Sequence, residues 1–168
     1  MTADELLHLR DDGWRHELIR GELKRMPFKG VERGLIVVDI AVNLDGFARA
    51  RRLGEVLAGT GFWVERDPDT VLAPDVAFIR AKRSVRTTGY FEGPPDAAFE
   101  IVEDDEPHDI AEKTREWLSA GCRAVVIVDP KTKSVRIHRV SGAIDATDAI
   151  EIDDVVPGWR MPLSEVFD

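Results

Sequence analysis

The sequence predicts a mixed α/β (α+β) fold in which a central mixed β-sheet is flanked by helices, with a further helix and hairpin at the N-terminus. Residues 96–102 and 123–129 are apolar runs of strand length, and residues 109–120 between them repeat apolar side chains at helical spacing. A strand, a helix and a second apolar strand in this order predict a βαβ-like unit whose helix packs on one face of the sheet.

The residues before this unit predict a short helix, a hairpin and a long helix. Thr2-Ala3-Asp4-Glu5 has the pattern of a capping box, so a helix should run to about Arg10. HELIRGELKRM alternates apolar and polar residues around Arg20-Gly21, as a hairpin does. Residues 32–53 predict the long helix, with Gly54 as its C-cap. The apolar residues that give the helical spacing are Leu35, Ile36, Ile40, Val42, Leu44 and Phe47.

Short strands are expected elsewhere in the chain. The sequences EVLA, FWVE and VAFIR are separated by Asp-Pro and Ala-Pro steps, which disfavour helix, and a polar loop follows at 81–95. Residues 133–139 alternate and should pair with the strand before them. EIDDVVPGWRMPLSEVF predicts a last strand and a helical turn.

Composition indicates one globular domain over residues 1–168, since 43% of the residues are hydrophobic, 33% are charged and no tract is biased. No apolar run approaches the roughly 20 residues that span a bilayer. The first residues lack the basic and then apolar layout of a signal peptide, so we expect a cytoplasmic protein with no membrane partner. The single cysteine, Cys122, is expected to face the core.

The formal charge of -9 argues against a protein that coats nucleic acid nonspecifically, but the charge is unevenly distributed. Residues 1–90 hold 15 Lys/Arg against 14 Asp/Glu, whereas residues 91–168 hold 8 against 18. One basic cluster, a candidate for phosphate binding, consists of Lys24, Arg25, Lys29 and Arg33. A solvated surface is the alternative interpretation of such a cluster.

Two carboxylates stand at apolar strands. Glu100 lies inside AAFEIV, where an ionised side chain is costly unless a charge compensates it. Strand alternation places Glu100 on the face of Ala98 and Val102, whose small side chains leave room around it. Asp75 follows Pro74 at the start of VAFI. Two such acids are suitable ligands for a hard divalent cation.

Lys113 lies on the helix after Glu100, at the edge of its apolar stripe, and could meet both acids at one point. Each residue has an alternative structural role when taken alone. Asp75 could bond its own backbone at a strand start. Lys113 could extend its stem along an apolar surface. The three together, in this order, indicate a site.

APDVAFI, PPDAAFEIV and DIAEKTREWLSAGCRAVVIVDP resemble the core of the Uma-two family of proposed bacterial endonucleases, a branch of the PD-(D/E)XK restriction-endonuclease-like superfamily. HELIRGELKRM, ERGLIVVDIAVNL and VPGWRMPLSEVF are also similar to that family, so the resemblance covers nearly the whole chain. It implies a restriction-endonuclease-like fold and a metal-dependent endonuclease acting on nucleic acid, DNA rather than RNA.

The resemblance also implies residue roles. Asp75 and Glu100 match the two acids of the motif, and they would hold Mg²⁺ or Mn²⁺ together with the backbone carbonyl of Ile101. Val102 occupies the usual lysine position, and Lys113 matches a lysine displaced onto the following helix. Lys113 would orient the attacking water or neutralise the developing charge.

The chain departs from the family in three respects that bear on activity. Arg33 stands where many relatives have a histidine, Glu103-Asp104-Asp105 replaces the Ser-Pro-Ser often seen after the second acid, and the connection to Lys113 is one residue shorter than expected. The negative charge at 103–106 could repel a phosphate backbone or recruit metal, with a solvated loop as the alternative.

Two further residues are candidates for the site. Glu17 could approach the metal from the opposite side, or lie exposed on its strand. His108 could relay a proton, or be a surface imidazole.

Two alternative functions use the same residues. The chain could be a weakly active or inactive nuclease fold that serves as a dimeric interaction module, or a metal-dependent hydrolase of another phosphodiester. A homodimer is expected in either case.

Overall fold

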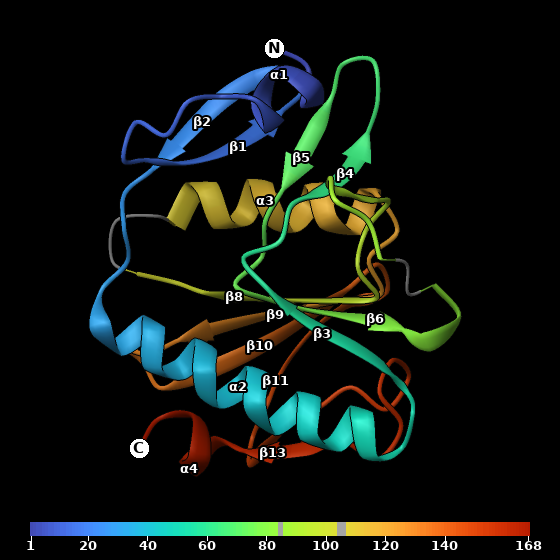
Figure 1. Ribbon diagram of the computed structural model, residues 1–168. Helices are drawn as coiled ribbons and strands as arrows, with labels where there is room; N and C mark the ends of the chain where they lie inside the picture. The colour runs from blue at the N-terminus through green and yellow to red at the C-terminus, as the bar shows by residue number, and fades with distance from the viewer. Residues whose placement is uncertain (84–85, 104–106) are drawn as a thin grey trace.

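The computed structural model describes residues 1–83, 86–103 and 107–168, with the side chains of its second long helix described from Ile110 (Figure 1). The helices are α1 Ala3–Leu7, α2 Val31–Ala50, α3 Pro107–Ser119 and α4 Leu163–Val166, with a 3-10 turn at Ala81–Arg83. The strands are β1 Arg15–Ile19, β2 Glu22–Met26, β3 Gly54–Ala58, β4 Phe62–Glu65, β5 Thr70–Leu72, β6 Val76–Arg80, β7 Phe91–Glu92, β8 Ala97–Ile101, β9 Ala124–Asp129, β10 Ser134–Arg139, β11 Gly142–Asp145, β12 Ala149–Glu151 and β13 Arg160–Pro162.

The central sheet has six strands in the order β11-β10-β9-β8-β6-β3. Strands β8 and β9 are parallel, whereas β6 pairs antiparallel with β8 and β10 pairs antiparallel with β9. The predicted βαβ-like unit is therefore present as β8, α3 and β9, and the predicted hairpin partner of β9 is β10. The sheet is mixed, as expected.

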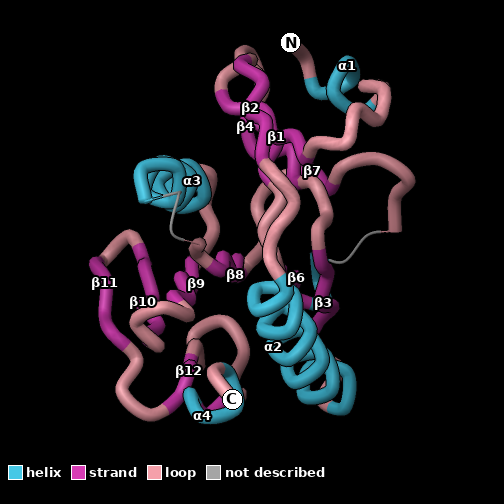
Figure 2. The backbone as a smooth tube through the Cα atoms, turned by 90° about the vertical axis from the view of Figure 1, so that its left-hand side faces the viewer, coloured by secondary structure: helices cyan, strands magenta, loops and turns pink. Residues whose placement is uncertain are grey.

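Helices α2 and α3 cover opposite faces of this sheet (Figures 1 and 2). On one face, Ile36, Ile40 and Leu44 of α2 pack with Phe99 and its neighbours in the main core. On the other face, Trp117 of α3 packs between the central sheet and a second, five-stranded sheet of order β2-β1-β5-β4-β7. Helix α3 therefore lies between two sheets, and side chains that point into that layer are withdrawn from solvent.

The N-terminal hairpin is confirmed, and it belongs to the second sheet through the pairing of Leu18 with Val71. The capping box at Thr2 is formed, but α1 ends at Leu7 and not near Arg10. Only Ala3 and Leu6 of this helix are buried, against Leu18 and Val71, so the residues beyond Leu7 have no core to join.

Four short strands were absent from the sequence expectation: β5, β7, β11 and one of the pair β12 and β13, since a single last strand was predicted before the helical turn that α4 forms. They span only two to four residues each, too few for an alternating pattern to be recognised. Strand β7 lies within the segment expected to be a polar loop.

The end of α2 differs from the prediction. The helix stops at Ala50, Arg52 takes the left-handed conformation with φ 54°, and Leu53 N donates to Ala48 O at 2.9 Å. Gly54 is not the C-cap; it opens β3. A β-carbon at Gly54 would overlap the carbonyl oxygen of Ile79, so glycine is needed there for the close approach of β3 and β6.

Cys122 is 1% exposed and faces the core, as predicted, and burial raises the pKa of its thiol to about 12. Among the described residues, no helix is both long and apolar enough to cross a bilayer.

We predict that Gly54→Ala lowers the free energy of unfolding by about 2 kcal/mol or more, because the added methyl group forces β3 away from β6. Gly46→Ala is the matched control, since a β-carbon there meets nothing within 4 Å. Gly46→Ala should raise the free energy of unfolding by about 0.5–1 kcal/mol through helix propensity. Urea unfolding measures both, and a Gly54→Ala variant as stable as the parent chain would contradict the packing.

Candidate active site

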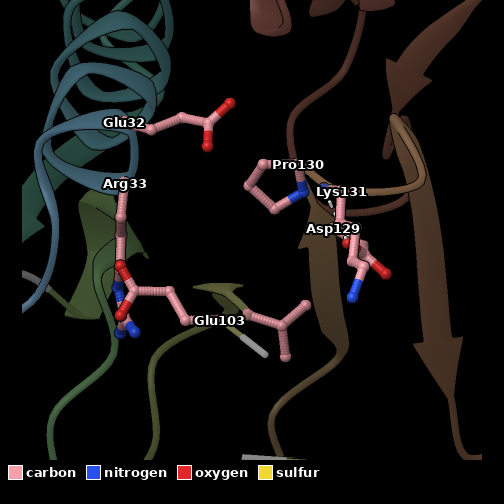
Figure 3. A pocket seen from close by; sticks show the side chains of 7 residues that line it. Glu32, Arg33, Glu103, Asp129, Pro130 and Lys131 are labelled. Carbon is pink, nitrogen blue, oxygen red and sulfur yellow. Dashed lines mark hydrogen bonds between the residues drawn. The ribbon is translucent and has the colours of Figure 1, made fainter. Parts of the chain in front are cut away.

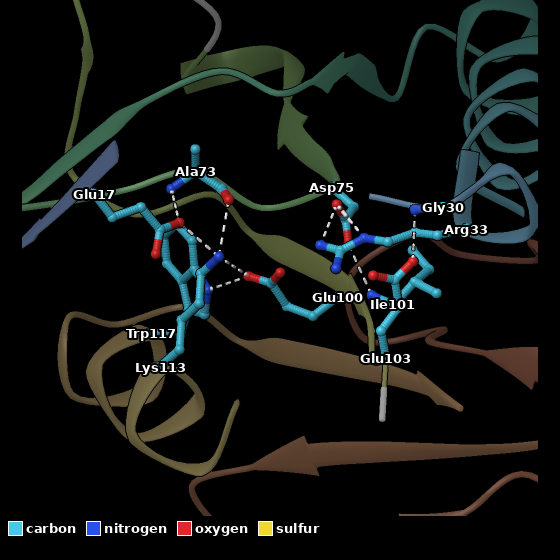
Figure 4. A network of polar contacts seen from close by, with 10 residues as sticks. All are labelled: Glu17, Gly30, Arg33, Ala73, Asp75, Glu100, Ile101, Glu103, Lys113 and Trp117. Carbon is cyan, nitrogen blue, oxygen red and sulfur yellow. Dashed lines mark hydrogen bonds and ion pairs between the residues drawn. The ribbon is translucent and has the colours of Figure 1, made fainter. Parts of the chain in front are cut away.

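Glu100 is buried on the face of β8 that meets α3. Its neighbours Phe99 and Ile101 point into the α2 core, whereas Ala98 points into the α3 layer, as strand alternation predicts. Glu100 is 1% exposed, and its Oε1 accepts hydrogen bonds from Lys113 Nζ at 2.9 Å and from Trp117 Nε1 at 3.0 Å (Figure 4). The carboxylate is thus fixed by two donors on one helix.

Lys113 is buried and all three of its ammonium protons can be assigned to acceptors. It lies 2.6 Å from Glu17 Oε1, 2.9 Å from Glu100 Oε1 and 2.9 Å from Ala73 O. An ammonium has three donors, so these contacts satisfy it. The sequence predicted that Lys113 lies at the edge of the apolar stripe of its helix. The second sheet covers that edge, so Lys113 is buried.

Glu17 completes this cluster from β1. It is 3% exposed, so the alternative of an exposed strand position is wrong. Its Oε1 accepts from the backbone amide of Ala73 at 2.8 Å as well as from Lys113. Glu17 therefore faces Glu100 across a shared ammonium.

Asp75 forms a second cluster, with Arg33. Arg33 Nη2 and Nε donate to Asp75 Oδ1 at 2.7 and 3.2 Å, and the amide of Ile101 donates to Asp75 Oδ2 at 2.8 Å. Val76 of β6 pairs with Phe99 of β8 in an antiparallel ladder. Asp75, the residue before Val76, therefore lies beside Glu100, the residue after Phe99. Glu100 lies between the Arg33 and Lys113 clusters (Figure 4).

The electrostatics of the site depend on burial. Burial raises the pKa of Glu100 to about 7; the Lys113 ammonium opposes this rise, whereas the carboxylates of Asp75 and Glu17 add to it. Burial would lower the pKa of Lys113, but Glu100 and Glu17 outweigh burial and raise it. The ammonium is thus charged at neutral pH, and Glu100 is near the midpoint of its titration.

The oxygen atoms of the two acids suit a hard divalent cation, but Asp75 is already paired with Arg33. Within the described part of the chain, Glu100 Oε2 is buried and has no hydrogen-bond partner, so an oxygen ligand is available there. The described residues contain no group of three or more His, Cys, Asp or Glu side chains placed to hold a metal. Two carboxylates and the carbonyl of Ile101 nevertheless suit Mg²⁺ or Mn²⁺, provided that Arg33 leaves Asp75.

Basic side chains surround the approach to these acids. A cavity of about 170 Å³ reaches Glu17, Glu100 and Lys113, and Lys24 and Arg25 line its rim. A second cavity, of about 400 Å³, reaches Asp75 past Arg15 and Lys29. All four predicted phosphate-binding residues line these cavities, but Arg33 is itself buried and paired with Asp75.

Some predicted features could not be placed, and some contacts were not predicted. The backbone of His108 lies in α3, but its side chain and residues 104–106 are outside the described residues. The hydrogen bond from Trp117 to Glu100 was missed, although Trp117 follows Lys113 by four residues and so shares its helix face. The ion pair between Arg33 and Asp75 had no signal in the local sequence.

Comparison with known proteins identifies the family and the fold. The sequence model of the Uma2 family, described as "Putative restriction endonuclease", matches residues 3–164. A solved structure titled "a putative nuclease belonging to DUF820 from Anabaena variabilis ATCC 29413" superposes with a TM-score of 0.83 at 18% identity, over 99% of this chain and 97% of that chain. No curated protein matched the chain. The predicted family resemblance and fold class are confirmed.

The raised pKa of Glu100 predicts how stability depends on pH. The ordinary pKa of Glu100 is 4.5, and in the folded protein it is about 7. At pH values between these two, the folded protein keeps a proton on Glu100 that the unfolded chain has lost. The contribution of Glu100 to the free energy of unfolding should therefore fall as pH rises through this window, by at most about 1.4 kcal/mol per pH unit.

Urea unfolding of the parent chain and of Glu100→Gln, which does not titrate, measures this contribution. The parent chain should lose stability relative to the variant up to about pH 7 and then level off. If the stability of the parent chain relative to Glu100→Gln stays constant or rises with pH, the Lys113 ammonium affects the pKa of Glu100 more than burial does.

Proposed function

This chain belongs to the Uma2 family, and on that premise we propose that it is a Mg²⁺- or Mn²⁺-dependent endonuclease that hydrolyses phosphodiester bonds in nucleic acid, DNA in preference to RNA. The observation that supports the proposal most strongly is the buried Glu100 beside Asp75. Its Oε2 lacks a hydrogen-bond partner among the described residues, which is costly unless a cation or water completes the site.

Asp75, Glu100 and the carbonyl of Ile101 would hold the metal. When bound, it would polarise the phosphate and lower the pKa of a water molecule. The amide of Ile101 and the indole of Trp117 each hold one carboxylate in place, at 2.8 and 3.0 Å. The chain itself therefore fixes the orientation of both acids before any ligand arrives.

Lys113 has two tasks in this proposal. It compensates the charge of the buried Glu100, and its bond to Glu17 fixes its position. Water attacks the phosphorus and loses a proton to solvent, the bond to one sugar oxygen breaks, and that oxygen takes up a proton from solvent and leaves as a hydroxyl. An ammonium next to the reacting phosphate would offset the negative charge that develops during the attack.

Binding of the substrate would rely on the basic rim. Lys24, Arg25, Lys29 and Arg15 line the two cavities. Contacts of this kind to phosphate weaken as salt concentration rises. The acidic second half of the chain would then limit nonspecific coating of nucleic acid.

We predict that Asp75→Asn and Glu100→Gln each reduce Mn²⁺-dependent cleavage of plasmid DNA by at least about 100-fold, because each removes a charged oxygen ligand. Glu116→Gln is the matched control: Glu116 is a buried acid on α3, the helix of Lys113, and its Oε1 pairs at 2.7 Å with Arg20, which is not a residue of the site. Circular dichroism checks that each variant is folded. Full activity in folded Asp75→Asn and Glu100→Gln would overturn the assignment.

The alternative functions are separated by two assays. Calorimetric titration with Mn²⁺ distinguishes a metal-dependent enzyme from an interaction module, which need not bind metal. Cleavage assays on DNA, RNA and small phosphodiesters then identify the substrate class. Cleavage of a small phosphodiester with both nucleic acids left intact would replace the endonuclease proposal.

We also propose that the chain forms a symmetric homodimer through α2. Val31, Leu35, Val38 and Val42 are all more than half exposed and follow one another at intervals of four, three and four residues on one helix face. This spacing is the same in both directions. Two antiparallel copies of α2 would thus place Val31 against Val42 and Leu35 against Val38, as a two-fold axis requires.

We predict that Leu35→Glu converts the dimer into a single chain of 18.8 kDa, since it puts a charge at the centre of the apolar stripe. Val140→Glu is the control, because Val140 is even more exposed than Leu35, at 84% against 61%, but belongs to the turn after β10 and not to α2. Light scattering after size exclusion reports the mass. A parent chain that is already monomeric would contradict the proposed dimer.

A further inference from the structure

Arg33 occupies the place of a cation at Asp75. It lies in the first turn of α2, and two of its nitrogens contact the same oxygen, Asp75 Oδ1, at 2.7 and 3.2 Å. The side chains are 6% and 5% exposed, so little solvent screens the pair. This contact is a buried ion pair and not part of a surface basic patch.

A divalent cation and this guanidinium would compete for Asp75. Mg²⁺ and Mn²⁺ bind carboxylate oxygens at about 2.1 Å and require a free lone pair. The two Arg33 nitrogens that contact Asp75 both bond Oδ1, and the amide of Ile101 donates to Oδ2, so within the described part of the chain only one lone pair, on Oδ2, stays open. An ion added to this carboxylate would lie within a few ångströms of a guanidinium nitrogen, where two positive charges repel strongly at low dielectric.

The formal charges of the buried site favour exchange. Counting only the buried ion pairs of the described residues, Glu17, Asp75 and Glu100 face Lys113 and Arg33, which leaves one net negative charge when all are ionised. A divalent ion in place of Arg33 makes the site neutral, whereas a divalent ion in addition to Arg33 leaves it positive. Burial penalises net charge, so replacement is favoured over addition.

Arg33 also has room and acceptors for a second position. It lines a cavity of about 550 Å³ between the start of α2 and the ends of β8 and β9 (Figure 3). Glu32, Glu103 and Asp129 line the same cavity, so a guanidinium that leaves Asp75 would meet carboxylates there. Arg33 borders the basic-lined cavity at Asp75 as well.

We infer that Arg33 is a displaceable resident cation: it and the divalent metal are alternative occupants of the Asp75 carboxylate, and the metal binds only as the guanidinium withdraws. Arg33 is then a regulatory residue of the site rather than one of the phosphate contacts. It keeps Asp75 paired in the metal-free protein and lowers the apparent metal affinity by the free energy needed to displace it. The inference rests on the proposed metal-dependent function.

Metal titration of Arg33→Met tests the inference directly. Methionine keeps most of the buried stem and removes the charge, so Mn²⁺ no longer has a competitor at Asp75. Calorimetry should show Mn²⁺ binding at least about tenfold tighter than in the parent chain. Mn²⁺ should also raise the melting temperature of the variant by more than it raises that of the parent chain. Affinity that is unchanged or weaker in folded Arg33→Met would overturn the inference.

Arg80→Met is the matched control. Arg80 Nε donates to Asp96 Oδ1 at 2.9 Å, Asp96 is 2% exposed, and Arg83 provides a second guanidinium to it. This variant also removes an arginine from a buried aspartate, but away from Glu100. Its Mn²⁺ affinity should equal that of the parent chain, and a tightening equal to that of Arg33→Met would contradict a specific role for Arg33.

A measurement on the parent chain guards against a variant that fails to fold. Magnetic resonance of the arginine Nε–H groups during Mg²⁺ titration should show the Arg33 signal, assigned by its absence from Arg33→Lys, move or exchange with solvent as Mg²⁺ binds. An Arg33 signal that stays unchanged through the titration would reject displacement.

The inference and the nuclease proposal fail in different ways. DNA cleavage that needs Asp75, with equal Mn²⁺ affinity in the parent chain and Arg33→Met, would keep the nuclease and reject the exchange. Tighter Mn²⁺ binding in Arg33→Met without cleavage of any nucleic acid would keep the exchange and reject the nuclease.

Discussion

The buried ammonium of Lys113 is the contact on which the arrangement of the site depends. Its three donors join Glu17 of β1, Glu100 of β8 and the carbonyl of Ala73 before β6. Glu17 belongs to the second sheet and Glu100 to the central sheet, on either side of α3, so one side chain links both sheets through the helix between them. Removing a buried cation of this kind would leave two carboxylates to repel each other in a dry layer.

The same contact leaves one oxygen of Glu100 available to a ligand. Lys113 and Trp117 bond only one oxygen of Glu100, and the other is buried without a hydrogen-bond partner in the described part of the chain. Across the strand pairing, Asp75 is held by Arg33 and by the backbone. One acid thus has an oxygen to offer, and the other is paired with a side chain that could be exchanged for a metal.

The sequence allowed the central elements to be predicted because their patterns are long. Strand alternation placed Glu100 on the α3 face, and its spacing to the helix predicted that Lys113 would approach it. Helix α2 was harder to orient. Its apolar residues lie on more than one face, so Leu35 and Val42 contribute to the helical spacing yet are exposed, and nothing in the pattern indicated that Arg33 would be buried.

Contacts between distant segments could not be predicted for a different reason. Glu17 and Lys113 lie almost a hundred residues apart, and their ion pair depends on how the second sheet packs over α3. That packing relies partly on β5 and β7, strands too short to be recognised. A glutamate in an alternating hairpin was therefore compatible with either an exposed or a buried position until the sheet order was known.

A crystal structure of the protein soaked in Mn²⁺, with data collected at the manganese absorption edge, tests the site most directly. We expect an anomalous peak that contacts Asp75 and Glu100 Oε2, with Lys113 still bonded to Glu17 and Glu100 and with Arg33 moved off Asp75. A soaked crystal with no anomalous density between the two acids, and with Arg33 still on Asp75, would contradict a metal site built from this pair.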